Sequence, residues 1–219
     1  MSTLGLVTIG QAPRSDVTPD IAATLSPEVD IVEVGALDRF DSAAAVEAAV
    51  GPREGEPVYV SRLADGTAVT VDRESVVELL GERIRDLESE VTAIGVLCTG
   101  HFPPFDVSVP VFEPSDLLSA WVSTILDGGT LGVIMPKEEQ EAMTFEKWAD
   151  YDLVTAAGSP YADEDEVSAA AADIGTDADL IVMDCMGYTP EMKATVREVT
   201  DTSVLLGRSV LAKTAEEVL

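Results

Sequence analysis

Two cysteines are the residues of this chain whose types and positions most favour chemistry. Cys98 ends the apolar run AIGVLC, Cys185 ends the apolar run LIVMDC, and each is followed by a glycine two residues later. Such runs are typical of buried parallel strands, and ligands of parallel sheets bind beyond the carboxyl ends of the strands. Cys185 also lies just before a helix start at Thr189, where backbone N–H groups favour a thiolate. The alternative for either cysteine is a small buried apolar side chain.

Two thiols that reach one carbon from opposite faces suit a racemase or an epimerase. One thiolate removes the proton beside a carboxylate, and the other thiol supplies a proton to the opposite face. Because that proton is very weakly acidic, the site must hold the substrate carboxylate with preorganised donors and exclude water. The cysteines therefore predict a site whose other residues bind a carboxylate.

The loop Gly10–Arg14, directly after the first predicted strand, offers donors of this kind. Arg14 can bind a carboxylate through two parallel N–H bonds, and Gln11 can add its side-chain amide. Ser15 or Asp16 is expected to cap the helix that follows, whose N-terminus also favours an anion. The alternative is that Arg14 merely pairs with surface carboxylates.

Further candidates for substrate binding lie beside the cysteines and after another predicted strand: Thr99, His101, Ser159, Gly187 and Tyr188. His101, the only histidine, has three interpretations: it polarises a thiol, contacts the ligand, or lies in a polar loop. A Cys98–His101 hydrolase pair also stays open, although a spacing of three residues in a turn does not by itself align thiol and base. Asp184 is expected to point to the other face of its strand from Cys185. The sequence has no metal-ligand spacing, phosphate-binding glycine motif or serine-nucleophile motif, so we expect no metal and no cofactor.

Short β-branched runs alternate with amphipathic stretches, which indicates an α/β fold with mainly parallel sheets. The expected strands are Leu4–Ile9, Asp30–Val34, Thr92–Cys98, Leu131–Met135, Leu153–Ala156, Leu180–Asp184 and Ser203–Leu206. The expected helices are Arg73–Ser89 with Asp72 as its N-cap, Ser115–Leu126, and one that starts at Thr189-Pro190-Glu191. The segment Pro57–Val71 breaks the alternation, because two short strands flank an Asp65-Gly66 turn and predict a β-hairpin.

A weak internal repeat indicates how these elements are grouped. LGLVTIGQ from Leu4 resembles LGVIMPKE from Leu131, and VTAIGVLCTGHF from Val91 resembles DADLIVMDCMGY from Asp177, each with a cysteine followed two residues later by a glycine. The repeat predicts two pseudo-symmetric, doubly wound α/β lobes that face each other. We expect the first lobe at residues 1–105 plus 207–219, with the hairpin inserted in it, and the second at residues 106–206.

The charge of the chain excludes some partners. Acidic residues number 41 against 13 basic ones, for a formal net charge of −28, and they are spread along the whole length. Such a surface repels nucleic acid and anionic membranes. The sequence has no signal peptide and no apolar run of membrane-spanning length, so we expect a cytoplasmic protein. Uniform acidity with few lysines suits the high-salt cytosol of a halophile, where the repulsion is screened; an acidic interaction surface is the alternative.

Several segments together resemble the AroM family: TIGQAPRSDVTPD, FEPSDLL, LGVIMPKEEQ and ADLIVMDCMGYT, within a resemblance that extends from Leu4 to Leu219. That family is similar to the aspartate/glutamate racemase superfamily, which includes hydantoin racemases, maleate isomerases and arylmalonate decarboxylases. The resemblance implies two lobes with a site between them, cofactor-independent chemistry, and one cysteine from each lobe, here Cys98 and Cys185. The amino-acid racemases carry Cys-Asn-Thr and Gly-Cys-Thr where this chain has Cys98-Thr99-Gly100 and Asp184-Cys185-Met186, which argues against an amino-acid substrate.

The leading hypothesis is a cofactor-independent racemase, epimerase or isomerase that acts on a small carboxylate in an interlobe cleft. Cys185 is expected to be the main acid/base group and Cys98 the second. One alternative is a decarboxylase or isomerase that uses a single cysteine. Another is a non-catalytic protein that binds a carboxylate metabolite or acts as a regulator. The expected partner is a small carboxylate metabolite, and a homodimer is a candidate assembly because members of the superfamily often form dimers.

Overall fold

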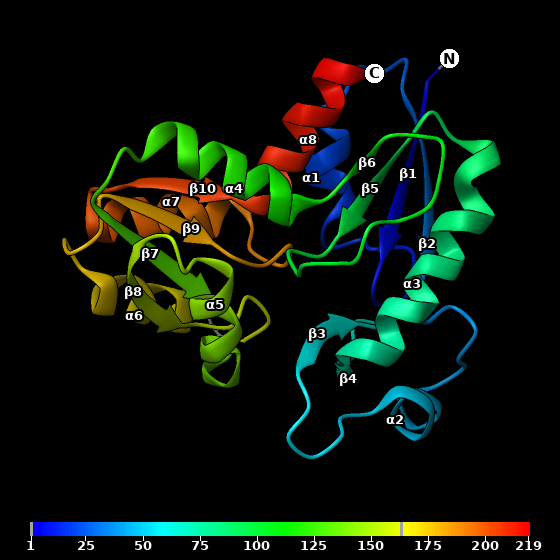
Figure 1. Ribbon diagram of the computed structural model, residues 1–219, viewed down its shortest axis with the longest axis horizontal. Helices are drawn as coiled ribbons and strands as arrows, with labels where there is room; N and C mark the ends of the chain where they lie inside the picture. The colour runs from blue at the N-terminus through cyan, green and yellow to red at the C-terminus, as the bar shows by residue number, and fades with distance from the viewer. Residues whose placement is uncertain (1, 163) are drawn as a thin grey trace. The chain divides into compact units, whose positions relative to one another are not determined.

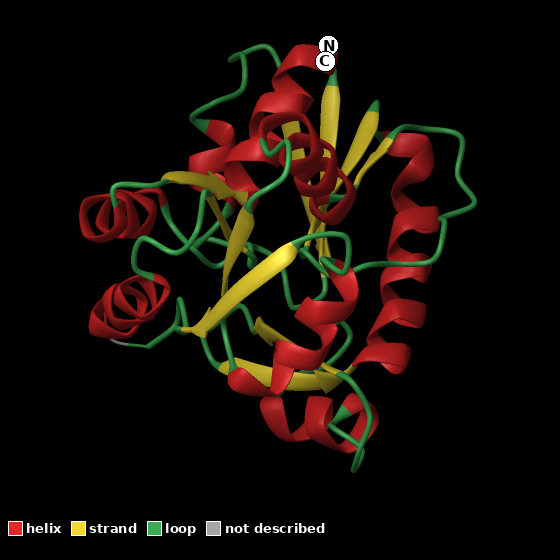
Figure 2. Ribbon diagram, turned by 60° about the vertical axis from the view of Figure 1, so that its left-hand side comes forward, coloured by secondary structure: helices red, strands yellow, loops and turns green. Residues whose placement is uncertain are grey.

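The chain forms two compact units, which the computed structural model describes over residues 2–162 and 164–219. The first unit comprises Met1–Pro114 and Leu211–Leu219, and the second comprises Ser115–Val210. The predicted division placed these boundaries after residues 105 and 206 instead. Figure 1 labels the elements of both units, and Figure 2 colours their helices, strands and loops.

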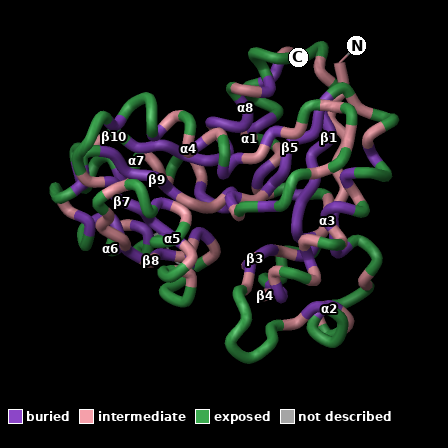
Figure 3. Tube along the Cα trace, viewed as in Figure 1, coloured by how far each residue is buried: buried purple, intermediate pink, exposed green. Residues whose placement is uncertain are grey.

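The first unit is built on a parallel sheet of strand order β2-β1-β5-β6. Its strands are β1 (Thr3–Thr8), β2 (Asp30–Gly35), β5 (Ala93–Leu97) and β6 (Val111–Phe112). Its helices are α1 (Thr18–Ala22), α2 (Ala43–Val50), α3 (Arg73–Leu87) and the 3₁₀ helix η1 (Glu88–Glu90). Every residue of β5 is buried, as expected for a strand covered on both faces (Figure 3).

The second unit repeats this topology with a parallel sheet of strand order β10-β9-β7-β8. Its strands are β7 (Thr130–Met135), β8 (Asp152–Ala157), β9 (Leu180–Met183) and β10 (Ser203–Leu206). Its helices are α4 (Pro114–Ile125), which starts at the unit boundary, the 3₁₀ helix η2 (Glu138–Gln140), α5 (Glu141–Lys147), α6 (Glu164–Ile174) and α7 (Pro190–Thr200). Helix α8 (Gly207–Val218) begins in this unit and continues from Leu211 in the first unit. Read from the other edge, the order becomes β8-β7-β9-β10, so β1 corresponds to β7 and β5 to β9.

The sheet of the second unit is covered on both faces, because alternate strand residues enter different clusters. Ile181 and Met183 pack with residues of α6 and α7. Leu180 and Val182 pack instead with residues of α4 and with Trp148, which directly follows α5. This alternation is the period of two expected of a strand, and it gives the doubly wound arrangement that the sequence predicts.

The predicted hairpin is confirmed as an insertion between α2 and α3. Strands β3 (Val58–Arg62) and β4 (Ala68–Asp72) pair antiparallel in a sheet of their own. Gly66 has φ 86°, a conformation that favours glycine in the tight turn between them.

All seven expected strands are present, with ends shifted by no more than one residue. The N-caps predicted for two helices are also confirmed: Asp72 accepts a hydrogen bond from the N–H of Ser75, and Thr189 accepts one from Met192. Strand β6 was not predicted, because two residues are too short to show a period. No helix of the described residues is both long and apolar enough to cross a membrane.

Candidate functional site

The two cysteines occupy equivalent positions in the two sheets. The internal repeat aligns Val7 of β1 with Ile134 of β7. Val7 pairs with Val96 of β5, and Ile134 pairs with Met183 of β9. In each sheet the cysteine follows that paired residue by two positions, so each thiol leaves the corresponding strand at the carboxyl edge, where ligands of parallel sheets bind.

Cys185 lies in a tight turn that continues β9. Its N–H donates to the carbonyl of Met183 at 3.0 Å, and its carbonyl accepts from the N–H of Tyr188 at 3.4 Å. The N–H of Gly187 donates to the sulfur of Cys185 at 3.4 Å. The side chain is half-buried and packs against the cluster of α6 and α7, whereas Asp184 contacts Trp148 on the opposite face. The prediction that Asp184 and Cys185 point to opposite faces is therefore confirmed.

Cys98 lies in a turn with the same hydrogen bond to sulfur. The N–H of Gly100 donates to the sulfur of Cys98 at 3.3 Å, and Cys98 is half-buried. Thr99 between them is buried, at 8% exposure. An N–H donor aimed at sulfur stabilises negative charge there, so both turns favour the thiolate by the same device.

His101 is exposed, and its carbonyl joins the turn to neighbouring elements. That carbonyl accepts from the hydroxyl of Tyr59 and from the guanidinium of Arg73, both at 3.3 Å. Within residues 2–162 and 164–219, no three His, Cys, Asp or Glu side chains gather as metal ligands would. The backbone of His101 thus fixes the Cys98 turn, and a role of its imidazole stays a prediction.

In each cysteine turn, the ring of a tyrosine packs against the glycine. A Cβ atom at Gly100 would lie 2.4 Å from the hydroxyl oxygen of Tyr59, and one at Gly187 would lie 2.6 Å from the hydroxyl oxygen of Tyr161. Both distances are shorter than real Cβ contacts, so a larger residue at either position would force the neighbouring side chain to shift. The sequence analysis missed both tyrosines, and its only signal was the glycine two residues after each cysteine.

Gln11 ties the loop after β1 to two other segments. Its amide nitrogen donates to the carbonyls of Leu37 and Phe40, at 3.2 and 2.7 Å. Its amide oxygen accepts from the N–H of Ala64 in the hairpin turn, at 3.0 Å. These contacts give Gln11 a structural task in the first unit, and its predicted contact with a substrate stays a prediction.

Arg14 is buried in the same loop, at 2% exposure, and binds a carboxylate of its own chain. Its Nε and Nη2 donate to the two oxygens of Asp16, each at 2.8 Å, and its Nη1 donates to the hydroxyl of Thr8 at 3.0 Å. Burial raises the pKa of Asp16, but the hydrogen bonds and charge of Arg14 outweigh it and lower that pKa. Arg14 therefore binds a carboxylate through two parallel hydrogen bonds, as expected, but the carboxylate is that of Asp16 in the same loop.

The expectation that Ser15 or Asp16 caps the following helix is wrong. Helix α1 has Val17 as its N-cap, with no side-chain cap hydrogen bond, and it spans five residues. Asp16 does not cap because its carboxylate pairs with Arg14. So short a helix offers little dipole for binding an anion.

Ser159 and Tyr188 lie in the second unit, near the Cys185 turn. The hydroxyl of Ser159 accepts from the N–H of Tyr161 at 3.2 Å. The hydroxyl of Tyr188 is fully buried and donates to the carbonyl of Gly158 at 2.7 Å. Burial, and then the negative charges of Cys185 and its neighbours, raise the pKa of Tyr188 well above its usual range. Tyr188 is therefore a neutral phenol that ties this turn to the loop after β8.

The AroM family model, described as AroM protein, matches residues 4–219. The chain belongs to the AroM family. No curated protein matches this AroM chain.

Solved structures show the fold of this AroM chain in other proteins. Glutamate racemase from Aquifex pyrophilus is 15% identical with a TM-score of 0.60, over 99% of this chain and 84% of that one. Maleate isomerase Iso from Pseudomonas putida S16 is 12% identical with a TM-score of 0.64, over 98% and 91%. Unliganded arylmalonate decarboxylase is 13% identical with a TM-score of 0.60, over 99% and 92%. Identities this low establish a shared two-lobe fold, as the resemblance in the sequence implied.

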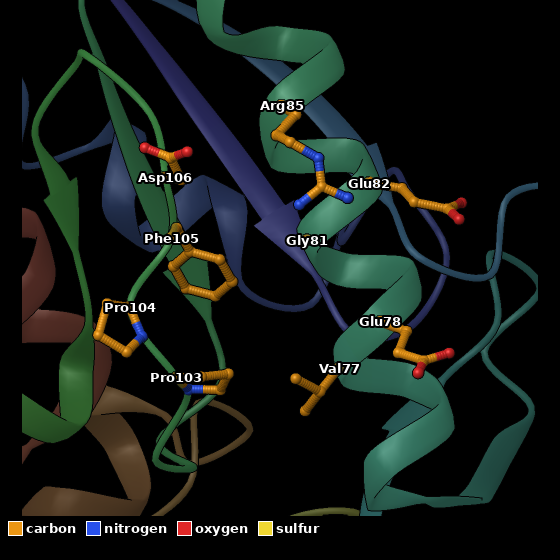
Figure 4. Close-up of a pocket in the computed structure, with 9 residues that line it drawn as sticks. All are labelled: Val77, Glu78, Gly81, Glu82, Arg85, Pro103, Pro104, Phe105 and Asp106. Carbon is orange, nitrogen blue, oxygen red and sulfur yellow. The ribbon is translucent and has the colours of Figure 1, made fainter.

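A hollow in the first unit of the AroM chain lies apart from these residues. Its volume is about 460 Å³, and it lies between α3 and the segment Pro103–Asp106. Figure 4 shows the side chains of Glu82 and Arg85 on α3, with Phe105 across from them. None of the predicted site residues lines it. Each unit therefore carries its own candidate residues, in its cysteine turn and the loops beside it, outside this hollow.

Proposed function

We propose that this AroM protein is a cofactor-independent racemase, epimerase or isomerase of a small carboxylate, in which cysteine thiols move the proton. One observation carries the proposal: corresponding strands of the two sheets end in a half-buried cysteine whose sulfur accepts a backbone N–H, at 3.3 and 3.4 Å. The same backbone donor in both units supports a thiolate at whichever cysteine is deprotonated in a given turnover.

The names of the structural neighbours support the choice of substrate class. Glutamate, maleate and an arylmalonate are all small carboxylates, and the three neighbours are named as a racemase, an isomerase and a decarboxylase. Each of these names denotes a reaction at a carbon beside a carboxylate. The proposal assigns the same kind of chemistry to this chain.

In the proposed racemisation, the Cys185 thiolate takes the proton from the carbon beside the carboxylate and becomes a thiol. The C–H electron pair passes into the carboxylate as an enediolate. The Cys98 thiol then gives its proton to the opposite face of the carbon and becomes a thiolate. The cysteines thus exchange protonation states, and the reverse turnover restores them.

The enediolate carries two negative charges, so its stabilisation decides the rate. We assign this task to the hydroxyls of Thr99 and Ser159 and to backbone N–H groups near Gly187. In this proposal Gln11 and Arg14 do not touch the enediolate. They hold the loop after β1 in place, because their polar atoms bond to other residues of the first unit.

The test is deuterium wash-in at the α-carbon, followed by NMR in ²H₂O with concentrated KCl. The substrates are glutamate, maleate and phenylmalonate, with isomerised or decarboxylated products followed in the same spectra. The variants are Cys185→Ala and Cys98→Ala, and Ser123→Ala on the exposed face of α4 is the matched control. We expect the control to turn over like the parent and Cys185→Ala to lose at least about 100-fold, the scale of acid/base catalysis.

Turnover that survives in Cys185→Ala contradicts the assignment of the main acid/base group. Loss in Cys185→Ala alone, with full activity in Cys98→Ala, identifies a one-cysteine isomerase or decarboxylase instead of a two-base racemase. Thermal stabilisation by a carboxylate without any exchange or product identifies a binding protein. A bifunctional thiol reagent such as dibromobimane checks separately whether both sulfurs reach one small molecule, as two-base chemistry requires.

A further inference from the structure

A buried ion pair adjoins the Cys185 turn in the second unit. The Nζ of Lys147, the last residue of α5, donates to the two oxygens of Asp184 at 2.8 and 2.9 Å. The indole N–H of Trp148 donates to the same carboxylate at 3.2 Å. The Lys147 and Asp184 side chains are 13% and 8% exposed, and Trp148 is 1% exposed. Asp184 therefore carries its charge in a largely buried site, directly before Cys185 in the chain.

The fold itself does not require this ion pair. In the first unit, the position that corresponds to Asp184 is Leu97, which is 2% exposed and directly precedes Cys98. An apolar residue thus fills the same place in the same topology. Burying two charges incurs a desolvation cost that their attraction often fails to recover, so a buried ion pair is weak grounds for stability. We therefore look for a role of the Lys147–Asp184 pair other than stabilising the fold.

Buried hydrogen bonds also hold the residues that follow Cys185. Arg208, at 1% exposure, donates from Nε and Nη2 to the carbonyl of Met186 at 3.1 and 2.7 Å. The hydroxyl of Tyr188 holds the carbonyl of Gly158. Together with the Asp184 carboxylate, these contacts tie the residues on both sides of the sulfur to α5, α8 and the loop after β8.

We propose that Lys147 is a positioning residue for Cys185: through Asp184 it anchors the turn that presents the thiol, and its ammonium cancels the carboxylate charge beside that thiol. An unneutralised Asp184 would repel a thiolate on the next residue, and because the Asp184 side chain is only 8% exposed, solvent screens that repulsion weakly. The inference rests on the proposed function only in taking Cys185 as the reactive thiol.

Several other ionisable groups face this region and stay constant in the test. They are Tyr188 on the turn itself, Tyr161 after β8, Glu166 on α6 and Arg208 on α8. Cys185, Asp184, Tyr161 and Glu166 all raise the pKa of the Tyr188 hydroxyl, which shows that they share one electrostatic environment.

The experiment measures the rate of iodoacetamide alkylation of Cys185 against pH, in a Cys98→Ser background that leaves one thiol. Lys147→Met removes the ammonium, Lys147→Gln keeps an amide donor without charge, and Lys147→Arg keeps the charge. Lys213→Met, at an exposed position of α8, is the matched control. Thermal unfolding in the same buffer identifies any variant that fails to fold.

We expect Lys147→Met and Lys147→Gln to shift the midpoint of the pH profile of alkylation to a pH about one unit higher. At neutral pH the alkylation of Cys185 would then be about tenfold slower. Lys147→Arg and Lys213→Met should keep the parent profile. The double variant Lys147→Met/Asp184→Asn should return toward the parent, because the carboxylate charge leaves with the ammonium.

A folded Lys147→Gln variant with the parent profile overturns the inference, and so does a double variant displaced as far as Lys147→Met. A Cys185 that alkylates no faster than a free thiol at every pH in the parent contradicts the proposed function instead. A reactive Cys185 that ignores Lys147 leaves the proposed function intact and refutes only the positioning role.

Discussion

Gly187→Ala is the substitution that most directly tests the description of the Cys185 turn. The added Cβ would lie 2.6 Å from the hydroxyl oxygen of Tyr161, 2.7 Å from its Cζ and 2.8 Å from Cγ of Pro160. Pro160 precedes Tyr161, and its ring limits how the backbone there can move. Either the Tyr161 ring and Pro160 shift, or the turn moves and draws the Gly187 N–H away from the sulfur of Cys185.

The expected cost follows from two opposing terms. Forcing an extra methyl into packed structure costs about 1–3 kcal/mol. Replacing glycine by alanine lowers the entropy of the unfolded chain and returns about 0.4–1 kcal/mol. The net loss of unfolding free energy should be about 1–2 kcal/mol, which corresponds to a fall of roughly 2–8 °C in Tm for a chain of this size.

Urea unfolding of the parent, Gly187→Ala and a control glycine measures this difference. The control is Gly81→Ala in α3, where a Cβ would meet only Nη1 of Arg85 at 3.4 Å, an ordinary contact. That helix-interior replacement should stabilise by roughly 0.5–1 kcal/mol. In a Tyr161→Ala background the cost of Gly187→Ala should fall but not vanish, because the added Cβ still meets Cγ of Pro160 at 2.8 Å. If Gly187→Ala unfolds at the parent's urea concentration or above, the close approach of Tyr161 to the turn is refuted.

Three further predictions concern single charges, a buried hydroxyl and the whole surface. Asp72→Asn should cost about 1 kcal/mol at pH 7, because the hydrogen bond from Arg53 holds the pKa of Asp72 to about 2, below its usual 3.8, and solvent screens the exposed Arg53. That stability is fully present above pH 4 and is lost as pH falls through 2, so the two proteins should converge in acid denaturation curves near pH 2. Tyr188→Phe should lower the unfolding free energy by about 1–3 kcal/mol, because it leaves the buried carbonyl of Gly158 without its 2.7 Å donor; urea unfolding would measure this, and no change would contradict it. Raising KCl from 0.1 to 2 M should raise Tm, because salt screens the repulsion among carboxylates of a chain with net charge −28; a Tm that falls with KCl would contradict the halophile interpretation.

The sequence predicts the strands of both sheets because their signal is local. Buried runs such as LIVM in β9 are continuous and apolar, and a parallel strand covered on both faces requires that composition. The repeat of LGLVTIGQ in LGVIMPKE then relates the sheets to each other, and the observed registers of β1 and β7 agree with it. Both cysteines are predictable as strand-end residues for the same reason.

The partners of the cysteine turns are not predictable in this way, because they come from distant segments. Lys147 precedes Asp184 by 37 positions, and Tyr59 precedes His101 by 42. Neither spacing carries a period, and each contact depends on where a helix or a hairpin packs. Arg14 illustrates a different difficulty. Its residue type predicts that it binds a carboxylate, but the sequence does not say which one. The fold of the loop after β1 brings it to Asp16, two residues away.

The two cysteine turns share a backbone design and differ in charge. Both sulfurs accept an N–H from the glycine two residues later, and both glycines lie against a tyrosine. The residue before the thiol is apolar in one unit, Leu97, and ionised and paired in the other, Asp184 with Lys147. A pair of thiols that exchanges protons in both directions needs comparable proton affinities, whereas an enzyme that protonates a single face needs one thiol tuned alone. The asymmetry around Asp184 thus makes Cys185 the thiol whose reactivity should respond most to its neighbours, and the Lys147 variants measure that response directly.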